Sequence, residues 1–251
     1  GKLDLQSNYQ VKKYETSKFT NFFINDLDWS YKVLNSSVFN SKLLGNVKNI
    51  NYETKNIDIY KKDTTSEVFG ALGYLTKINF EKSNSKSTHY LTPKILLRYA
   101  PGQMRNEQSG NRLNPLTSFS LNRLNNPRNF ETGLSGTVGF DYKINNKDRD
   151  FDFSIAQIIS EKENKKMPSI TSLDEKMSDL VGSTSAKIND KLELGYNFSI
   201  DQNYNELNYN DFETKINFDP MKIGFNYILE NKHIGNQEYF KTKVDFNQNN
   251  N

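Results

Sequence analysis

Residues 130–160 read FETGLSGTVGFDYKINNKDRDFDFSIAQIIS, and the alternation of apolar and polar side chains in this stretch decides the fold. The first half carries its apolar side chains at even positions, namely Phe130, Leu134, Val138, Phe140, Tyr142 and Ile144. Its polar side chains lie at odd positions, namely Glu131, Ser135, Thr137, Asp141 and Lys143. Because successive side chains point to opposite faces in a β-strand, the pattern predicts a strand with one apolar and one polar face.

A second strand of the same kind follows a polar turn at residues 145–148. Its apolar residues Phe151, Phe153, Ile155 and Ile159 alternate with Asp152, Ser154 and Ser160. Two alternating strands joined by a short polar turn form an antiparallel hairpin. The glycines at 133, 136 and 139 are expected to let the sheet bend.

The composition favours apolar residues spread over many strands. Hydrophobic residues make up 35% of the 251 residues, aromatic residues make up 13%, and the mean hydropathy is -0.80. A transmembrane barrel has such a composition because every second residue of a strand meets lipid. No run reaches the roughly 18 to 20 apolar residues of a spanning helix, which excludes a helical membrane protein. We therefore predict an all-β fold, an antiparallel transmembrane β-barrel.

Neither the charges nor the reactive residues indicate an enzyme or a nucleic-acid partner. The 33 basic and 30 acidic residues are scattered along the chain, and there is no cysteine. His89 and His233 lack the spacing of a metal site, and no GxSxG nucleophile elbow occurs. Asp148, Asp150 and Asp152 lack the glycine and closing glutamate of a calcium loop. We expect no catalytic site, no metal and no cofactor.

About twelve strands follow from the same alternation along the whole chain, each close to the 9 to 11 residues that a tilted strand needs to cross a bilayer. Loops near 15, 53–66, 101–129, 161–179, 202–206 and 231–237 are expected on the outer side. Turns near 36, 84, 146, 190 and 219 are expected on the periplasmic side. The strand-like piece 119–124 is assigned to the long loop, because counting it as a spanning strand would place the two longest loops on opposite sides of the membrane.

The polar face of the strands is expected to line a watery lumen. We predict that seven residues face the lumen: Glu131, Thr137, Asp141, Lys143, Glu193, Asn197 and Asp201. Pro93 has no N–H to donate, so it predicts an edge, a bulge or a locally open seam in its strand. The arginines Arg98, Arg123 and Arg128 and the lysines of 161–176 are either contacts for lipid phosphates or ordinary loop charges.

Four segments resemble, in order and spacing, the barrel domain of LptD, the outer-membrane lipopolysaccharide-assembly protein family. They are LTPKILLRYAPG (91–102), FSLNRLNNPRNFETGLSGTVGFDYK (119–143), FSIAQIIS (153–160) and MPSITSLDEKMSDLVGS (167–183). The resemblance covers about residues 88 to 218. The positions that carry it are Pro93, Tyr99, Pro101, Phe119, Asn122, Arg123, Gly133, Gln157, Ser178 and Asp179.

The resemblance implies a large barrel in the cell outer membrane that moves lipopolysaccharide to the outer leaflet without making or breaking a bond. It also implies a periplasmic bridge of the LptA kind that delivers the lipid, an LptE lipoprotein plug, and lateral exit through a seam between the first and last strands. Residues 1–251 are expected to be an internal part of one barrel domain, incomplete relative to the family's barrel, without the periplasmic jelly-roll domain and the seam strands. The absence of cysteine departs from the disulfide-dependent maturation of some members.

Two other classes of protein remain open from the sequence. Another outer-membrane barrel, such as a porin or a nutrient receptor, would show the same alternation. A soluble or surface adhesive β-protein would bury the apolar face against a second sheet instead. Fold class alone does not separate these functions.

Overall fold

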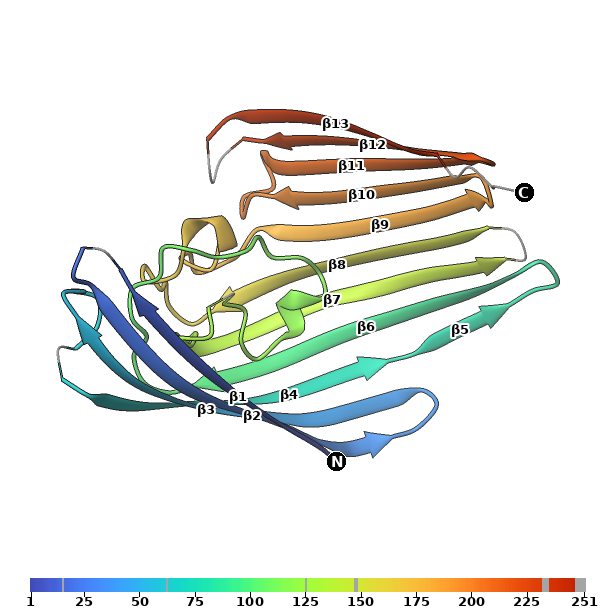
Figure 1. Ribbon diagram of the computed structural model, residues 1–251. Helices are drawn as coiled ribbons and strands as arrows, with labels where there is room; N and C mark the ends of the chain where they lie inside the picture. The colour runs from blue at the N-terminus through green and yellow to red at the C-terminus, as the bar shows by residue number, and fades with distance from the viewer. Residues whose placement is uncertain (15, 62, 125, 147–148, 232–234, 247–251) are drawn as a thin grey trace, which may run out of the picture.

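A computed structural model describes residues 1–14, 16–61, 63–124, 126–146, 149–231 and 235–246. The described chain forms one antiparallel sheet in which each strand pairs with the next along the sequence, except that the fourth and fifth strands both pair with the sixth (Figure 1). The strands are β1 (Lys2–Lys13), β2 (Phe19–Asn35), β3 (Phe39–Lys55), β4 (Thr65–Ile78), β5 (Phe80–Ser83), β6 (Ser87–Ala100), β7 (Gly133–Asn146), β8 (Asp150–Ser160), β9 (Leu180–Asn189), β10 (Leu192–Ile200), β11 (Leu207–Phe218), β12 (Met221–Glu230) and β13 (Gln237–Phe246).

The all-β antiparallel prediction is confirmed, and the strand count is close to the expected twelve. The described residues form thirteen strands, because an interruption at Asn79 divides one expected strand into β4 and β5, which both pair with β6. Pro93 of β6 lies opposite this interruption, between the pairs Lys77–Lys94 and Phe80–Leu91. The proline offers no N–H to the neighbouring strand, so the ladder is locally open there.

The sheet is open in the part of the chain that the structure describes: β1 and β13 each pair with a single neighbour. Long connections lie at one end of the strands and tight turns at the other (Figure 1). The piece 119–124 is not a strand and lies inside the long loop, as its assignment to that loop predicted. It begins at the last residue of the 3-10 turn η1 (Thr117–Phe119); a second such turn, η2 (Ser169–Thr171), lies between β8 and β9. Among the described residues, no helix is long and apolar enough to cross a membrane.

The sheet curves, and residues 101–132 lie in its hollow (Figure 1). We call the face toward these residues the concave face and the opposite one the convex face. Thr137 on the concave face is 1% exposed, whereas Val138, its neighbour in β7, is 44% exposed on the convex face. Leu72 and Leu97, also on the convex face, are 57% and 58% exposed. Alternation along the strands therefore produces a sheet with one apolar, exposed surface.

The loop 101–132 is a folded segment that contributes to two hydrophobic clusters. Leu121 and Phe130 pack with residues of β2, β3 and β4, such as Phe22 and Ile50. On the other side, Met104, Leu113 and Leu124 pack with Ala156, Ile158, Met167, Leu173 and Val181. Burial of these apolar side chains fixes the loop to two separate parts of the sheet.

The prediction that Phe130 shares the face of Leu134 and Phe140 is wrong. The strand β7 begins at Gly133, so the alternation does not extend back to residue 130. Phe130 is fully buried under the concave face, where its ring lies 6.0 Å from the ring of Phe69. Gly133 has a φ of 122°, which a residue with a side chain rarely adopts, so it permits the change of direction into β7.

Candidate functional site

Arginines tie the loop 101–132 to strands that lie far apart in the sheet. Arg105 pairs with Glu67 of β4, and its guanidinium lies 5.1 Å from the centre of the Tyr60 ring. The guanidinium of Arg128 donates to Gln10 of β1 and lies over the Phe22 ring of β2. The third contact joins Arg112 to Glu230 at the end of β12. The loop thus spans the hollow from β1 to β12.

Two arginines and one glutamate form a buried ionic cluster at the loop end of β6 and β7. Arg123 Nε donates to Glu131 Oε2 at 2.8 Å, and a second nitrogen of Arg123 also contacts the Glu131 carboxylate. Arg98 Nε donates to the carbonyl of Leu121 at 2.6 Å, and Arg98 Nη1 lies 3.7 Å from Glu131 Oε1. All three residues are at most 5% exposed.

The two arginines keep Glu131 ionised. Burial by itself would raise the pKa of Glu131, but the positive charges of Arg123 and Arg98 outweigh burial and hold the pKa below its usual value. The cluster contains two guanidinium groups and one carboxylate, so one positive charge remains uncompensated within it. Such a buried arrangement needs every one of its partners, because an unpaired charge in a low-dielectric interior is costly.

A second polar centre joins β8 to the chain before β9. Gln157 Nε2 donates to the carbonyl of Ser178 at 3.0 Å, and the Tyr204 hydroxyl donates to Gln157 Oε1 at 2.7 Å. Ser178 Oγ accepts the N–H of Ile158 at 2.9 Å. Asp179 Oδ2 accepts from Ser199 Oγ at 2.7 Å and from Asn208 Nδ2 at 3.0 Å.

The positions that carried the family resemblance fall into these two centres and their surroundings. Arg123 lies in the first, and Gln157, Ser178 and Asp179 form the second. Phe119 lies under the ammonium of Lys94, 4.6 Å from ring centre to nitrogen. Asn122 is partly buried next to Arg123, and Gly133 opens β7. The remaining three lie along or after β6: Pro93 opposite the strand interruption, Tyr99 on the convex face and Pro101 at the start of the loop.

Of the seven residues predicted to face a lumen, five lie on the concave side of the strands. Thr137 donates to the carbonyl of Ser118 at 3.0 Å, and Asp141 pairs with Lys94 at 2.7 Å. The others are Lys143, Glu193 and Asn197. Glu131 and Asp201 lie outside the strands: Glu131 in the ionic cluster and Asp201 in the turn after β10, where it accepts backbone N–H groups.

Charges alternate in sign along one row of the concave face. The register pairs Asp150 of β8 with Lys187 of β9, Lys187 with Glu193 of β10, and Glu193 with Lys215 of β11. Opposite charges on directly paired residues stabilise neighbouring strands, whereas like charges would destabilise them. The row lies toward the tight-turn end of the strands, away from the loop 101–132, and its side chains are partly exposed.

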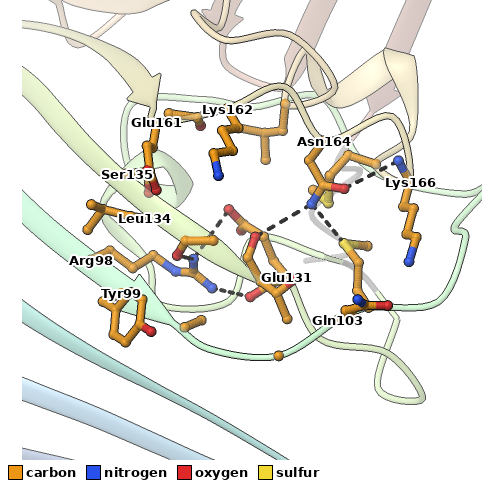
Figure 2. Close-up of a pocket in the computed structure, with 18 of the residues that line it drawn as sticks. Arg98, Tyr99, Gln103, Glu131, Leu134, Ser135, Glu161, Lys162, Asn164 and Lys166 are labelled. Carbon is orange, nitrogen blue, oxygen red and sulfur yellow. Dashed lines mark hydrogen bonds and ion pairs between the residues drawn. The ribbon is translucent and has the colours of Figure 1, made fainter.

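A cavity of about 570 Å³ opens between the ionic cluster and the loop 161–179 (Figure 2). Arg98, Glu131 and Ser135 line its inner wall. Lys162 and Lys166 line the opposite wall, and Figure 2 shows Lys162 pointing toward Glu131. Asn164 joins the two loops, because its Nδ2 lies 3.1 Å from Met104 Sδ and 3.5 Å from the carbonyl oxygen of Thr132.

The arginine anchors were not predicted, although the sequence contains a signal for them. Five of the six arginines of the chain lie between residues 98 and 128, while the positive side chains elsewhere are lysines apart from Arg149. The partners Gln10, Glu67 and Glu230 follow no such pattern, because each lies in a different strand. Their role depends on how the loop crosses the sheet.

Among the described residues, no group of three or more metal-binding side chains is present. His89 contacts Ser87 Oγ at 3.0 Å and the Tyr142 hydroxyl at 2.8 Å, so the ring nitrogens have a serine and a tyrosine as partners. A hydrolase triad would place a carboxylate or an amide on the second nitrogen. His233 and Asp148 lie outside the described residues.

One comparison with known proteins identifies a family. A family model described as LptD, LPS transport system D, matches residues 22–250 of the 251. The match covers β2 from Phe22 onward, every described strand from β3 to β13, and both polar centres. No curated protein matches the chain.

Proposed function

This chain belongs to the LptD family, LPS transport system D, and we propose from that membership that it forms part of the wall of a barrel that passes lipopolysaccharide to the outer leaflet of the outer membrane. The family acts in lipopolysaccharide transport and assembly at the outer membrane. In our proposal the sugar portion of the lipid moves along the polar concave face, while the acyl chains stay near the hydrocarbon. The lipid leaves sideways through a gate, and no covalent bond changes.

The contrast between the two faces of the sheet supports this proposal most directly. Apolar side chains such as Leu97 and Val138 are exposed on the convex face, where a membrane would cover them. On the concave face, paired residues such as Asp150 and Lys187 form rows of charge that suit a hydrated path. A soluble sandwich would instead bury the convex face against a second sheet, and the described residues contain a single sheet.

We infer that the sheet is part of one larger barrel. The outer edges of β1 and β13 carry backbone groups that pair with no strand among the described residues. Within a membrane such edges need partners, because unpaired backbone N–H and C=O groups are costly in hydrocarbon. Every strand from β2 to β12, apart from the short β5, has a neighbour on both sides, which supports a gate outside this segment.

The family also suggests two protein partners for the assembled barrel: an LptE lipoprotein plug and a periplasmic bridge of the LptA kind. The loop 101–132 fills the hollow near one end of the strands. The charged row of Asp150, Lys187, Glu193 and Lys215 lies toward the other end and is left uncovered among the described residues. That surface is therefore the part of the concave face that we assign to a plug or to the arriving lipid.

Depletion of the protein that carries this chain, followed by measurement of lipopolysaccharide on the cell surface, tests the proposal. We expect surface lipopolysaccharide to fall while newly made lipid accumulates in the periplasm and inner membrane. A porin or nutrient receptor would leave surface lipopolysaccharide unchanged and reduce solute uptake instead. That second result would overturn the proposed function.

A further inference from the structure

A line of amide and hydroxyl side chains interrupts the apolar convex face on β1 to β4. Ser7 Oγ donates to Asn25 Oδ1 at 2.8 Å, and Asn49 Nδ2 donates to Ser66 Oγ at 3.0 Å. The register places Ser7, Asn25 and Asn49 directly opposite one another. All four side chains are exposed or partly exposed. The interruption therefore runs across four neighbouring strands.

The convex face differs on the two sides of this line. Toward the tight turns, the next three convex positions of β2 and β3 are uncharged: Leu27, Trp29, Tyr31, Val47, Gly45 and Leu43. Toward the loops, Glu53 and Lys55 of β3 are exposed on the same face. Charged groups and exposed amides carry donors and acceptors that hydrocarbon cannot satisfy. Hydrocarbon can therefore cover the convex face only on the tight-turn side of the line.

The same change occurs on the last strands, at a different register. Asn210 of β11 accepts a hydrogen bond from the Tyr196 hydroxyl, and Glu238 of β13 accepts one from the Tyr227 hydroxyl at 2.7 Å. The register aligns Asn210 with Glu238 through Leu229 of β12. Toward the tight turns, exposed apolar side chains follow on the convex face of β11 and β13: Phe212, Phe218, Phe240, Val244 and Phe246.

The offset between the two parts of the line gives the tilt of the strands. The register row of Asn210 reaches Pro93 of β6, whose neighbour Lys94 pairs with Lys77 of β4. The row of Asn49 crosses β4 at Val68 instead. An offset of about ten residues over about seven strand spacings corresponds to a tilt of about 45°, for a rise of about 3.3 Å per residue and a spacing of about 4.8 Å. The strands of membrane barrels tilt by about 35–45°.

The distance from the line to the tight turns fits the thickness of a bilayer. About ten residues of β2 separate Asn25 from Asn35, and about eight of β11 separate Asn210 from Phe218. A tilted strand needs about 9 to 11 residues to cross. A single membrane level therefore accounts for both parts of the line.

From these observations we infer that the line marks the outer surface of the hydrocarbon, and that the convex side chains between it and the loops of β1 to β4 contact the lipid headgroups of the outer leaflet. Figure 1 shows the loop ends of β1 to β3 extending beyond those of β10 to β13. Asn51, which donates to Asn49, and Asn21 offer further amides there. Such amides can donate to and accept from the sugars and phosphates of headgroups. The inference rests on the proposed function, which places the loops outside the cell.

The test measures the depth of single fluorophores in bilayers that contain the full-length protein. Each fluorophore is attached to one introduced cysteine and is quenched by lipids with a nitroxide on the headgroup or in the middle of an acyl chain. We expect headgroup quenching to dominate at Asn51 and mid-chain quenching at Leu72, which lies about 14 Å deeper at this tilt. The control is Asn8, next to Ser7 but on the concave face, where neither lipid should quench.

A second pair of positions tests the tilt. Asn49 and Asn210 should lie at equal depth although their register rows differ. Register rows parallel to the membrane would place Asn210 level with Ile78 instead, and that result would contradict the line. Mid-chain quenching at Asn51, or quenching there by neither lipid, would overturn the boundary.

The depletion experiment is independent of these measurements. If depletion lowers surface lipopolysaccharide while Asn51 lies among the acyl chains, the boundary fails and the proposed function stands. If Asn51 lies at the headgroups while depletion leaves surface lipopolysaccharide unchanged, the membrane contact stands and the transport fails.

Discussion

Arg112 of the loop 101–132 binds Glu230 at the end of β12, a residue 118 positions further along the chain. The Glu230 side chain is 4% exposed and the Arg112 side chain 16%, so the pair is largely removed from water. The guanidinium also lies 4.3 Å from the centre of the Tyr209 ring of β11. A single side chain therefore connects the loop to the last strands of the sheet, opposite the contacts that Arg128 makes near its beginning.

Replacement of Arg112 by Met should release the loop from β11 and β12. The change leaves a buried carboxylate without its main cation, and we expect the free energy of unfolding to fall by about 3 kcal/mol. Urea unfolding in detergent micelles measures this loss, and limited proteolysis should show faster cleavage between residues 101 and 132. Arg149→Met, in an exposed turn at the other end of the strands, serves as the control. Equal stability of the two variants would contradict the anchoring role of Arg112.

Replacement of Glu131 by Gln should destabilise the protein more than any exposed acidic substitution. The variant keeps the shape of the side chain but leaves Arg98 and Arg123 buried without a counter-charge, at a cost of about 3–5 kcal/mol. Urea unfolding at neutral pH is the measurement. Glu161→Gln, which removes an exposed carboxylate from the rim of the same cavity, should change the unfolding free energy by less than about 0.5 kcal/mol.

The ionisation of Glu131 also predicts a pH dependence. Its pKa in the folded protein is held below the value of 4.5 for a free glutamate, so the unfolded chain takes up this proton at higher pH. The stabilisation is thus complete above about pH 4.5 and is lost as pH falls through the folded pKa. Unfolding midpoints measured from neutral pH to about pH 3 should fall more steeply for wild type than for Glu131→Gln. Parallel curves would show that Glu131 does not titrate in this way.

The strands were predictable because their signal is local. Each residue of β7 or β10 needs only its own neighbours in sequence to reveal its face, and the period of two is set by strand geometry. The tight turns were predictable for the same reason. The prediction was wrong at Phe130, because the strand begins only at Gly133. The positive φ of Gly133 changes the direction of the chain there, so the alternation does not reach back to residue 130.

The loop 101–132 was not predictable in its details. Its buried residues, such as Met104, Leu113 and Leu124, follow neither a period of two nor a period of 3.6. Their burial depends on Ala156, Ile158 and Val181, which lie in strands that the loop reaches only after the sheet has curved. The pairing of Arg112 with Glu230 was not predictable for the same reason. The two residues are 118 positions apart, and only the tertiary fold brings them together.

Asp179 and Asn208 allow a test of the second polar centre by exchange. Asp179→Asn replaces one acceptor oxygen by an amide and disturbs the bonds from Ser199 and Asn208, so we expect a loss of about 1–3 kcal/mol. Asn208→Asp alone would place two carboxylates together and should cost at least as much. The double variant restores a donor and an acceptor, so its loss of unfolding free energy should be smaller than the sum of the two single losses by about 1 kcal/mol. Strict additivity would show that the two side chains do not depend on each other.

The two faces of the sheet can be tested at adjacent positions, because the natural chain has no cysteine to interfere. The register places Phe140, Ile155, Gly182 and Phe198 in one convex row. The adjacent row, on the concave face, contains Asp141, Ser154, Ser183 and Asn197. Single cysteines at Asp141 and Asn197 should react with a charged, water-soluble thiol reagent in membranes that contain the full-length protein. Cysteines at Phe140 and Phe198 should react instead with a lipid-soluble probe, since strand neighbours point to opposite faces. The reverse result, with residues 140 and 198 in water and 141 and 197 in lipid, would overturn both the polar path and the transport proposed along it.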